Sequence, residues 1–417
     1  MDEKHAWAYS LSMAKTYDIT IVGGGVIGSV LALHLARLDY QVLLLDAAEL
    51  DMSATDPERV IALSEGSKRY LDKLGVWQDV YASGAGLIQH IAVREPNNIG
   101  AVDMFHSEIQ DAGALGYVLE IRHVLAAVQQ AFPENITVLT HATCLGFRQH
   151  DNGAIVKLDT HEGEKEVTSK LLVGADGTNS FVRKHAGILT SGWDHNRIGL
   201  VASVSAGNGH GDTAYECFRE EGPLALLPLV DGRFSIVWSV APKTAMELLK
   251  LNDAGFLNML KTEAGDAITQ QVGGFKAVGN RASFPLELRI AKQFAKDNVV
   301  LLGNAAHTIH PIAGQGMNLG LRDVAVLADI LSQSWAKADL SKLLIGQTYA
   351  ERRRLDTLAV AGFTEGVLEA FSAPVSSLSP KRWLRGTGLN TMETMPALKH
   401  LLLEQAAGIG QLKGLSS

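Results

Sequence analysis

Runs of apolar residues alternate with a stretch of helical periodicity near the start of the chain. Ile19–Val22 and Val42–Leu45 are short, largely apolar runs of the kind that strands buried on both faces show. Between them, Leu31, Leu35 and Leu38 follow a helical spacing. The order strand, helix, strand predicts a parallel α/β unit.

The same pattern returns later in the chain. Leu171–Gly174 and Asn298–Gly303 predict buried strands, and Val324–Leu331 has helical periodicity. From about residue 192 to 284 the pattern changes to alternating strands with glycine-rich connections, interrupted by one helical segment, Ala245–Lys261. This middle stretch predicts a second, mostly antiparallel sheet.

Three shorter features complete the expected arrangement. Arg122–Phe132 has a helical pattern, and turn residues 151–153 predict a hairpin that pairs strand Ala154–Asp159 with strand Ile136–Thr140. The C-terminal part is again helical. Its cluster Arg352–Arg354 is most simply a solvated helix face, and docking of an acidic partner is the alternative.

Composition is that of an ordinary globular protein. The 417 residues are 47% hydrophobic and 20% charged, enough for two or three domains with substantial cores. The net charge of −8 argues against a nucleic-acid-binding protein. Two cysteines without C-x-x-C spacing support neither disulfides nor zinc and favour the reducing cytoplasm. We expect no signal peptide and no membrane span, because no apolar run reaches the roughly 18 residues that a span needs.

A glycine-rich turn joins the first expected strand to its helix. Gly23, Gly25 and Gly28 have the spacing G-x-G-x-x-G, and Asp46 follows 18 residues after Gly28. Such glycines allow the turn, the approach of a pyrophosphate and close packing of the helix, and an acid about 20 residues further on holds a ribose. The pattern predicts an adenine dinucleotide site; the alternative is a glycine loop without chemical meaning.

Other polar positions have both a plain and a functional interpretation. Asp176 and Gly177 follow a predicted strand, which is ordinarily just a turn, but open α/β sheets bind ligands at that edge. Arg59 is either a solvated charge or a guanidinium that reaches an anionic cofactor. The residues alone leave these choices open.

A long motif follows the strand at Asn298–Gly303. His307 and His310 lack nearby carboxylate or cysteine ligands and precede Pro311, so we expect no metal site. Gly314–Gly320 contains three glycines before the expected helix. It predicts a loop whose N–H groups face an acceptor without side-chain obstruction.

In order along the chain, these motifs resemble those of the single-component flavin aromatic hydroxylases. The stretches that carry the resemblance are Gly23–Gly28, Gly174–Gly177 and Gly303–His307. The ubiquinone-biosynthesis branch, and within it most closely the 2-polyprenyl-6-methoxyphenol hydroxylases, is resembled in Gly303–Gly320, Gly222–Leu229 and Ser283–Leu286. The likeness covers nearly the whole chain from Tyr17.

The resemblance implies an FAD site and assigns residues to it. Gly23, Gly25 and Gly28 would hold the FAD pyrophosphate, and Asp46 the adenosine ribose. The other cofactor positions that it implies are Arg59, Arg122, Asp176, Gly177, Asn304, Gly316, Met317 and Asn318. The catalytic, flavin-facing loop would include Pro311, Gly314 and Gln315.

Two positions depart from the family pattern. Asn304 stands where many aromatic hydroxylases have aspartate, and its amide can donate to a phosphate that a carboxylate would repel. Asp46 stands where many relatives have glutamate, and the shorter acid still reaches a ribose. FAD binding is therefore expected despite both differences.

The implied reaction is hydroxylation of a polyprenyl phenol with O2 and NADH or NADPH, through a C4a-hydroperoxide of the flavin. Only one dinucleotide fold is visible, so the nicotinamide would bind transiently. Tyr215, Phe218 and Leu227 would wall the substrate pocket, although hydrophobic core is the plainer role for each. The alternatives are a flavin-dependent isoprenoid reductase and a non-catalytic FAD-binding subunit of a biosynthetic complex.

The implied fold is α/β with an α+β second domain. A discontinuous, Rossmann-like FAD-binding domain would comprise residues 17–90, 116–190 and 285–340. An antiparallel substrate domain would comprise 91–115 and 191–284, followed by a C-terminal helical region, 341–417. The lipid-soluble substrate implies peripheral membrane contact by a cytoplasmic protein, a lipid carrier or a ubiquinone-biosynthesis complex. The apolar stretch 398–412 could dock on a membrane, but packing within the protein is its default interpretation.

Overall fold

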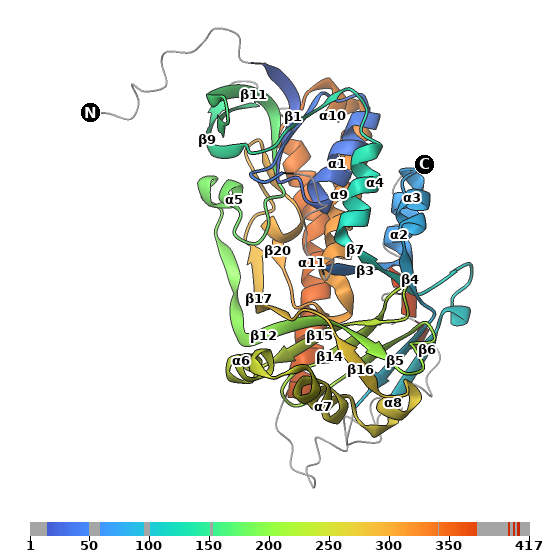
Figure 1. Ribbon diagram of the computed structural model, residues 1–417. Coiled ribbons are helices and arrows are strands. Elements are labelled where there is room, and N and C mark those ends of the chain that lie inside the picture. Colours follow the sequence, from blue (N-terminus) through green and yellow to red (C-terminus); the bar gives the residue numbers. More distant parts are fainter. Residues whose placement is uncertain are drawn as a thin grey trace.

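The computed structural model has the predicted α/β class, with three sheets and a set of long helices (Figure 1). It describes residues 15–49, 59–95, 101–150, 153–340, 342–372, 399–400, 403–404 and 407–408.

An eight-stranded sheet with a parallel centre contains the first motif. Its main order is β18-β19-β11-β1-β2-β8, and β10 and β9 extend it from β11. The strand bounds are β1 Thr16–Val22, β2 Val42–Leu45, β8 Ile136–Leu139, β9 Thr143–His150, β10 Gly153–Thr160, β11 Gly163–Gly174, β18 Ala295–Lys296 and β19 Val299–Leu301. β1 runs parallel to β2 and to β11, and β11 runs parallel to β19, whereas β10 and β18 pair antiparallel at the sides.

Three helices pack beside this sheet: α1 (Val26–Arg37), α4 (Ile121–Gln130) and α9 (Gln315–Ser332). α1 contacts both of the others, and its Leu31 and Leu35 are fully buried, as the helical spacing predicts. The shorter elements around them are α5 (Phe181–His185), α10 (Ser334–Ala338), η4 (Gly303–Ala305) and η5 (Ile312–Gly314).

The second sheet has nine strands and is mostly antiparallel, as predicted. Its order is β20-β17-β12-β15-β14-β13-β5-β6, with β16 beside β12. The bounds are β5 His90–Arg94, β6 Ala101–Phe105, β12 Thr190–Ala206, β13 Thr213–Cys217, β14 Leu224–Pro228, β15 Phe234–Val240, β16 Phe275–Val278, β17 Ala282–Ala291 and β20 His307–Thr308. β20 follows β19 of the eight-stranded sheet within the motif Asn298–Gly320, so this motif joins the two large sheets.

The helical segment predicted at Ala245–Lys261 is two helices, α6 (Pro242–Lys250) and α7 (Asp253–Ala264), and α8 (Asp266–Gln271) follows. Leu251 is extended, and Oδ1 of Asn252 accepts a hydrogen bond from the N–H of Gly255 at 2.9 Å. Asparagine is a strong N-cap, so Asn252 starts a second helix, whereas the apolar periodicity alone predicts a single continuous helix.

The predicted pairing of Ala154–Asp159 with Ile136–Thr140 is wrong. β10 pairs with β9, the intervening strand, whereas β8 pairs in parallel with β2. The hairpin expected before Gly153 does form between β9 and β10, although residues 151–152 lie outside the described residues. The longer but more polar strand β9 thus pairs with β10 in place of the short apolar strand β8.

A small sheet of order β3-β7-β4 connects the two large ones. Its elements and neighbours are β3 Val60–Ser64, β4 Ala85–Ile88, β7 Gly116–Glu120, α2 Glu65–Lys73, α3 Trp77–Ala82 and η3 His106–Glu108. Leu403 and Ala407, which belong to the apolar stretch 398–412, are buried in a cluster with Ile88 and Leu115 of this region. At these described positions the stretch packs within the protein.

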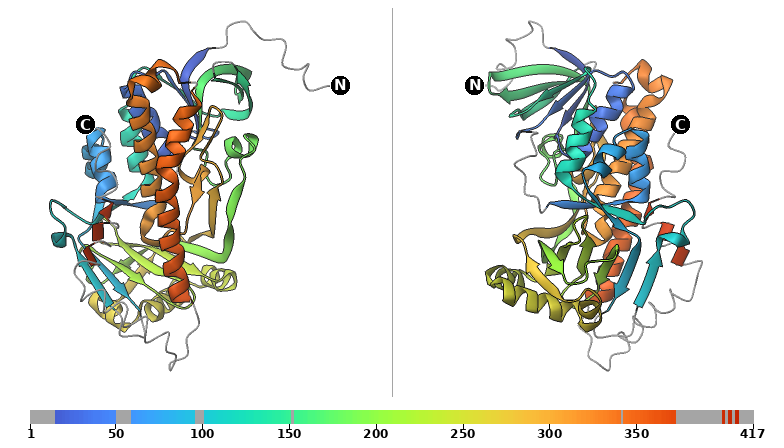
Figure 2. Two further views of the ribbon diagram at one scale, coloured as in Figure 1. Left: turned by 180° about the vertical axis from the view of Figure 1, so that it is seen from behind. Right: turned by 45° about the vertical axis from the view of Figure 1, so that its right-hand side comes forward.

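The long helix α11 (Leu343–Ser372) runs beside both large sheets (Figures 1 and 2). None of the described helices is long and apolar enough to cross a membrane. The interpretation of Arg352–Arg354 as a solvated face is wrong for Arg353, which is only 3% exposed and lies between α11 and α9. Arg352 pairs with Asp329 of α9 at 2.6 Å.

Candidate functional site

Four sequence motifs follow four neighbouring strands at one edge of the parallel sheet. Val22 of β1 lies beside Leu45 of β2 and Gly174 of β11, and Gly174 lies beside Leu301 of β19. The turns that leave these strands therefore meet at the carboxyl edge of the sheet, where open α/β sheets bind ligands.

The glycine turn is tight against the sheet and open where a phosphate would lie. Gly23 has a φ of +109°, and a Cβ on Gly28 would lie 1.9 Å from the carbonyl oxygen of Gly23. A Cβ on Gly25 would meet nothing within 4 Å. This open space is next to the N-terminus of α1, which no side chain caps, so backbone N–H groups and the helix dipole face it.

Asp46 is fixed to the same turn. Its Oδ2 accepts a hydrogen bond from the N–H of Gly24 at 2.6 Å, and its Oδ1 accepts from the N–H of Ala48 at 2.9 Å. The carboxylate is partly exposed and stands between the ends of β1 and β2. An acid in this place suits the ribose of a dinucleotide that lies along the turn.

Arg59 and Arg122 are far apart in sequence but adjacent in space. The N–H of Ile121 donates to the carbonyl of Arg59 at 3.0 Å, since β3 pairs with β7 and both arginines border that pairing. Arg59 is exposed, and Nε of Arg122 donates to Glu120 at 2.5 Å. The two residues are therefore neighbours along the backbone, and binding of one anionic ligand by both guanidinium groups stays a prediction.

The two carboxylate oxygens of Asp176 differ, because one is hydrogen-bonded within the fold and the other is not. Its Oδ2 accepts from the N–H groups of Phe181 and Val182 at 2.6 and 3.0 Å and so begins α5, while its Oδ1 is buried without a partner. Gly177, with a φ of +78°, borders open space. The turn interpretation is correct for this carboxylate, and a second role in ligand binding stays a prediction.

Arg183, which the sequence did not mark as functional, clamps two motifs together. It is 3% exposed and donates to the carbonyls of Thr178 and Ala305, at 2.8 Å each. Those carbonyls belong to the turn after β11 and the turn after β19. The one local feature that could have drawn attention to Arg183 is that its N–H bonds to Ser180, the residue that caps α5.

The predicted loop at Gly314–Gly320 is mostly helix, because α9 begins at Gln315. Gly314 is in the left-handed conformation (φ +62°) and starts the helix, and a Cβ on Gly316 would meet nothing within 4 Å. No side chain caps this helix, and the first N–H groups of a helix, here those of Gly316 and Met317, have no acceptor within the helix. The expected N–H donors are thus present, supplied by a helix N-terminus.

Asn318 contributes to the fold around that first turn. Its Oδ1 accepts from Ser64 and Ser67 at 2.9 and 2.7 Å, and its Nδ2 donates to the carbonyls of Ala62 and Gly314 at 3.0 and 2.9 Å. Every hydrogen-bonding position of the amide is used, so the side chain holds β3 against α9. Any contact with a flavin at this residue falls to its backbone.

The remaining predicted residues border the same space. Asn304 lies in η4 with an exposed side chain, and Pro311 and Gln315 are half-buried on either side of η5. Met317 is partly buried against the main core. The structure therefore brings the turns with Gly23–Gly28, Asp46, Asp176 and Asn304 to one edge of the sheet, and cofactor binding by the remaining residues stays a prediction.

A buried ion network stands behind this motif. Asp323 of α9 accepts from Nε2 of His307 and Nε of Arg353, both at 2.6 Å, and from the N–H of Gly303 at 2.8 Å. Arg353 also pairs with Asp356. Burial opposes ionisation of Asp323, but His307 and Arg353 outweigh it and lower its pKa. In the sequence, this network is indicated by the adjacent charges Arg322 and Asp323, which interrupt the apolar pattern of α9.

The residues expected to wall a substrate pocket do not share one face. Tyr215 pairs with Leu226, and both are buried among α6–α8, whereas Leu227 points to the other face and packs in the cluster beside the small sheet. Tyr215 therefore does not line a pocket with Leu227, because successive strand residues face opposite sides. Phe218 stacks on Phe371 of α11, with ring centroids 4.3 Å apart.

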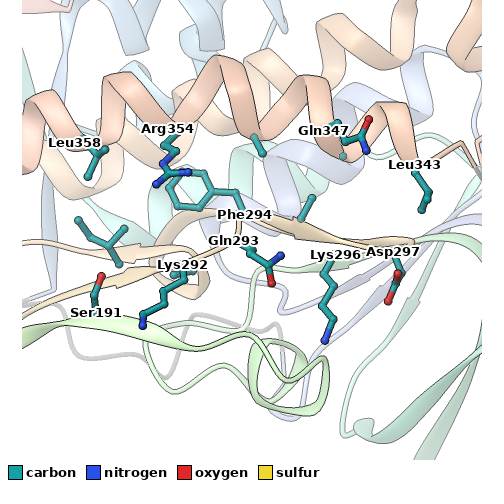
Figure 3. A pocket seen from close by; sticks show the side chains of 15 residues that line it. Ser191, Lys292, Gln293, Phe294, Lys296, Asp297, Leu343, Gln347, Arg354 and Leu358 are labelled. Atoms are coloured by element: carbon teal, nitrogen blue, oxygen red, sulfur yellow. The ribbon is translucent and has the colours of Figure 1, made fainter.

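Two hollows lie along α11. The smaller, of about 390 Å³, is lined by Trp193, His195, Arg197, Gly222, Ser239, His310, Glu365, Leu368 and Glu369. The larger, of about 830 Å³, is a groove between α11 and residues 290–297, into which Arg354 and Leu358 project from the helix (Figure 3). None of the predicted cofactor residues lines the larger groove, whereas His310 joins the smaller cavity to the flavin motif.

Comparison with known proteins agrees with this geometry. A family model for the FAD binding domain matches residues 16–363. The chain is 32% identical over 403 residues to the 3-demethoxyubiquinol 3-hydroxylase of Escherichia coli (strain K12), over 94% of this chain and 98% of the relative. It is 30% identical to the ubiquinone hydroxylase UbiL of Rhodospirillum rubrum, over 95% of this chain and 91% of the relative.

A solved structure repeats the fold at low identity. The p-nitrophenol 4-monooxygenase PnpA from Pseudomonas putida DLL-E4 superposes with a TM-score of 0.78 over 97% of this chain and 100% of that one, at 18% identity. This likeness concerns the fold alone.

Proposed function

The chain belongs to the FAD-binding-domain family of flavin-dependent aromatic monooxygenases, and we propose that it hydroxylates the ring of a polyprenyl phenol in ubiquinone biosynthesis, using O2 and NADH or NADPH. The family resemblance inferred from the sequence is confirmed. The observation that carries the flavin part of the proposal is the meeting of the four motifs at one sheet edge, and His310 of the last motif lines the smaller cavity.

The residues present fit FAD. The open space over Gly25 admits a pyrophosphate, the N-terminus of α1 favours its charge, and Asp46 is placed for the ribose. Arg59 and Arg122 would lie along the same ligand. The N–H groups of the first turn of α9 would face the flavin ring and favour negative charge on it.

When bound, FAD supplies the redox chemistry that transfers one oxygen atom to the ring. The chain's own part is to position the ring and exclude water. Arg183 holds the turn after β11 to the turn after β19, and Asn318 holds β3 to the first turn of α9. A site held by buried hydrogen bonds excludes water better than a mobile loop does.

The substrate class rests on the relatives and on chemistry. The printed name of the Escherichia coli relative is that of a hydroxylase of 3-demethoxyubiquinol. A polyprenyl phenol is lipid-soluble, so the proposal includes peripheral contact with a membrane, or delivery by a carrier protein or a biosynthetic complex. The division into an FAD-binding domain, a substrate domain and a C-terminal region at the predicted residues belongs to the same proposal.

The test uses the purified protein with its FAD spectrum confirmed. NADH or NADPH oxidation and oxygen uptake are followed with and without a short-tailed polyprenyl phenol, and products are identified by mass. Substrate-stimulated uptake with a product one oxygen heavier supports the proposal. Saturation of an alkene without oxygen uptake would indicate a reductase instead, and bound FAD without any stimulated oxidation would indicate a non-catalytic subunit.

A matched pair of variants tests the cofactor site. Gly25→Ala fills the open space over α1 without straining the backbone, so we expect at least a tenfold loss of FAD affinity in a folded protein. Gly362→Ala, on an exposed part of α11 with equal room for a Cβ, should leave FAD binding unchanged. Equal FAD affinity of the two variants would refute the assigned pyrophosphate site.

A further inference from the structure

The smaller cavity brings together polar groups from three separate elements. His195 lies on β12, Glu365 lies on α11, and His310 lies between β20 and η5. The rings of His195 and His310 meet edge to face, with centroids 5.6 Å apart. Exposed Trp193 and Glu369 mark the mouth of the cavity, and buried His310 marks its inner end.

Four side-chain atoms of the residues that line this cavity lack hydrogen-bond partners, although Glu365 also has a side-chain hydrogen bond with Trp193. His310 is 2% exposed, and neither of its ring nitrogens has a hydrogen bond. Nε2 of His195 lies 3.3 Å from Oε1 of Glu365, but neither atom has a partner in hydrogen-bonding geometry. Buried polar groups are nearly always paired in folded proteins, so several unpaired groups around one cavity point to a polar ligand.

The charge of the cavity selects the ligand. Burial and the neighbouring His195 lower the pKa of His310 to about 3, and burial lowers that of His195, so both rings are neutral at pH 7. Burial raises the pKa of Glu365. Arg197 and Glu369, which both line the cavity, carry opposite charges, and Glu365 adds no positive charge in either state. Without surplus positive charge, the cavity disfavours a carboxylate and suits an uncharged group that both donates and accepts hydrogen bonds.

We infer that this cavity binds the head of an uncharged phenol, with a ring nitrogen of His310 accepting a hydrogen bond from the phenolic hydroxyl. His195 and Glu365 complete the site by contacting a second oxygen on the ring. Because Pro311 directly follows His310, a ring bound here lies next to the predicted flavin-facing segment. The inference rests on the proposed function for its substrate class and adds the residues that recognise the hydroxyl.

The experiment measures binding to the FAD-loaded protein by isothermal titration calorimetry. 2-Methoxyphenol is compared with 1,2-dimethoxybenzene, which has the same ring but no hydroxyl donor. We expect the phenol to bind about tenfold more tightly, which corresponds to one good hydrogen bond. His310→Leu should reduce this ratio to about one, and His310→Asn, which keeps an acceptor, should restore part of it.

His161→Leu is the matched control, because His161 is exposed in a distant turn. It should keep the wild-type ratio, and FAD content read from the absorbance spectrum shows that each variant is folded. An unchanged ratio in FAD-loaded His310→Leu would overturn the inference, as would tighter binding of the anion 4-hydroxybenzoate than of 2-methoxyphenol.

Failure of the site and failure of the proposed function are separable. Substrate-stimulated oxygen uptake without a His310-dependent preference for the hydroxyl would overturn the site and leave the hydroxylase proposal standing. A His310-dependent preference in a protein that shows no stimulated uptake would support the site and refute the proposed reaction.

Discussion

His307 and His310 lie three residues apart in one motif, and both are buried, yet only His307 has a hydrogen-bonded ring nitrogen. Nε2 of His307 is bonded to Asp323, which in turn binds Arg353, and this network ties the end of β19 to α9 and α11. His310 has no hydrogen bond at either nitrogen and faces a cavity. The first histidine belongs to the stability of the fold, whereas the second is available to a ligand.

The difference shows why burial alone does not identify a functional residue. A buried polar group costs free energy unless it is paired, and the protein pairs the groups that hold its elements together. Groups left unpaired around a cavity are those for which a ligand is the remaining partner. Substitutions in the two regions should therefore affect different properties, in the following order of expected size.

Arg353→Leu should have the largest effect, a loss of about 3–5 kcal/mol in the free energy of unfolding, because it removes the cation that buried Asp323 and half-buried Asp356 share. Urea denaturation of the variant and the wild type measures it. Arg354→Leu is the control, since Arg354 lines the open groove and should change stability by less than about 0.5 kcal/mol. Similar losses in both variants would show that the network has no special weight.

His307→Leu should cost about 2–3 kcal/mol, because Asp323 loses a donor but keeps Arg353 and the N–H of Gly303. If the two residues act through one bond, adding His307→Leu to an Asp323→Asn variant should lower the free energy of unfolding no further. A double-mutant cycle by urea denaturation gives this coupling. Additive effects would contradict the network and place the role of His307 elsewhere.

The sequence allowed the site's backbone frame to be predicted, because apolar runs and glycine spacing are local properties. The strands before Gly23, Asp46, Asp176 and Gly303 were expected, and parallel pairing then places the turns after them together. The α/β class and the antiparallel second sheet are confirmed. The predicted domain boundaries stay a prediction.

The contacts between distant side chains could not be predicted. Arg353 looks like its neighbours in the sequence, and only the packing of α11 on α9 shows that it is buried. His195 and Glu365 lie 170 positions apart and meet because α11 crosses the end of β12. Periodicity detects which residues share an element but not which elements meet.

The region around His310 should respond to acid. His310 has a pKa lowered to about 3 in the folded state, against about 6.5 in the unfolded chain. Between these values the unfolded chain binds a proton that the folded protein does not, so stability is complete above pH 6.5 and falls as the pH drops. From pH 8 to pH 5 this residue should cost about 2 kcal/mol.

The measurement is the difference between the wild type and His310→Leu in urea denaturation at several pH values. Buried His34, whose pKa is also lowered, contributes equally to both proteins and cancels. His195 and Glu365, which face His310, are present in both. A pH-independent difference would mean that His310 titrates alike in the folded and unfolded chains.

The smallest effect is expected for His310→Leu at pH 8. Its effect on the free energy of unfolding should have the opposite sign from that of His307→Leu. His310→Leu removes two unpaired nitrogens and fills a similar volume with apolar atoms, so the free energy of unfolding should stay the same or rise by up to about 1 kcal/mol. His307→Leu, measured in the same series, should fall. A loss of more than about 1 kcal/mol in His310→Leu would show that His310 is a structural residue with a partner of its own, and the contrast between the two histidines would then no longer separate stability from ligand binding.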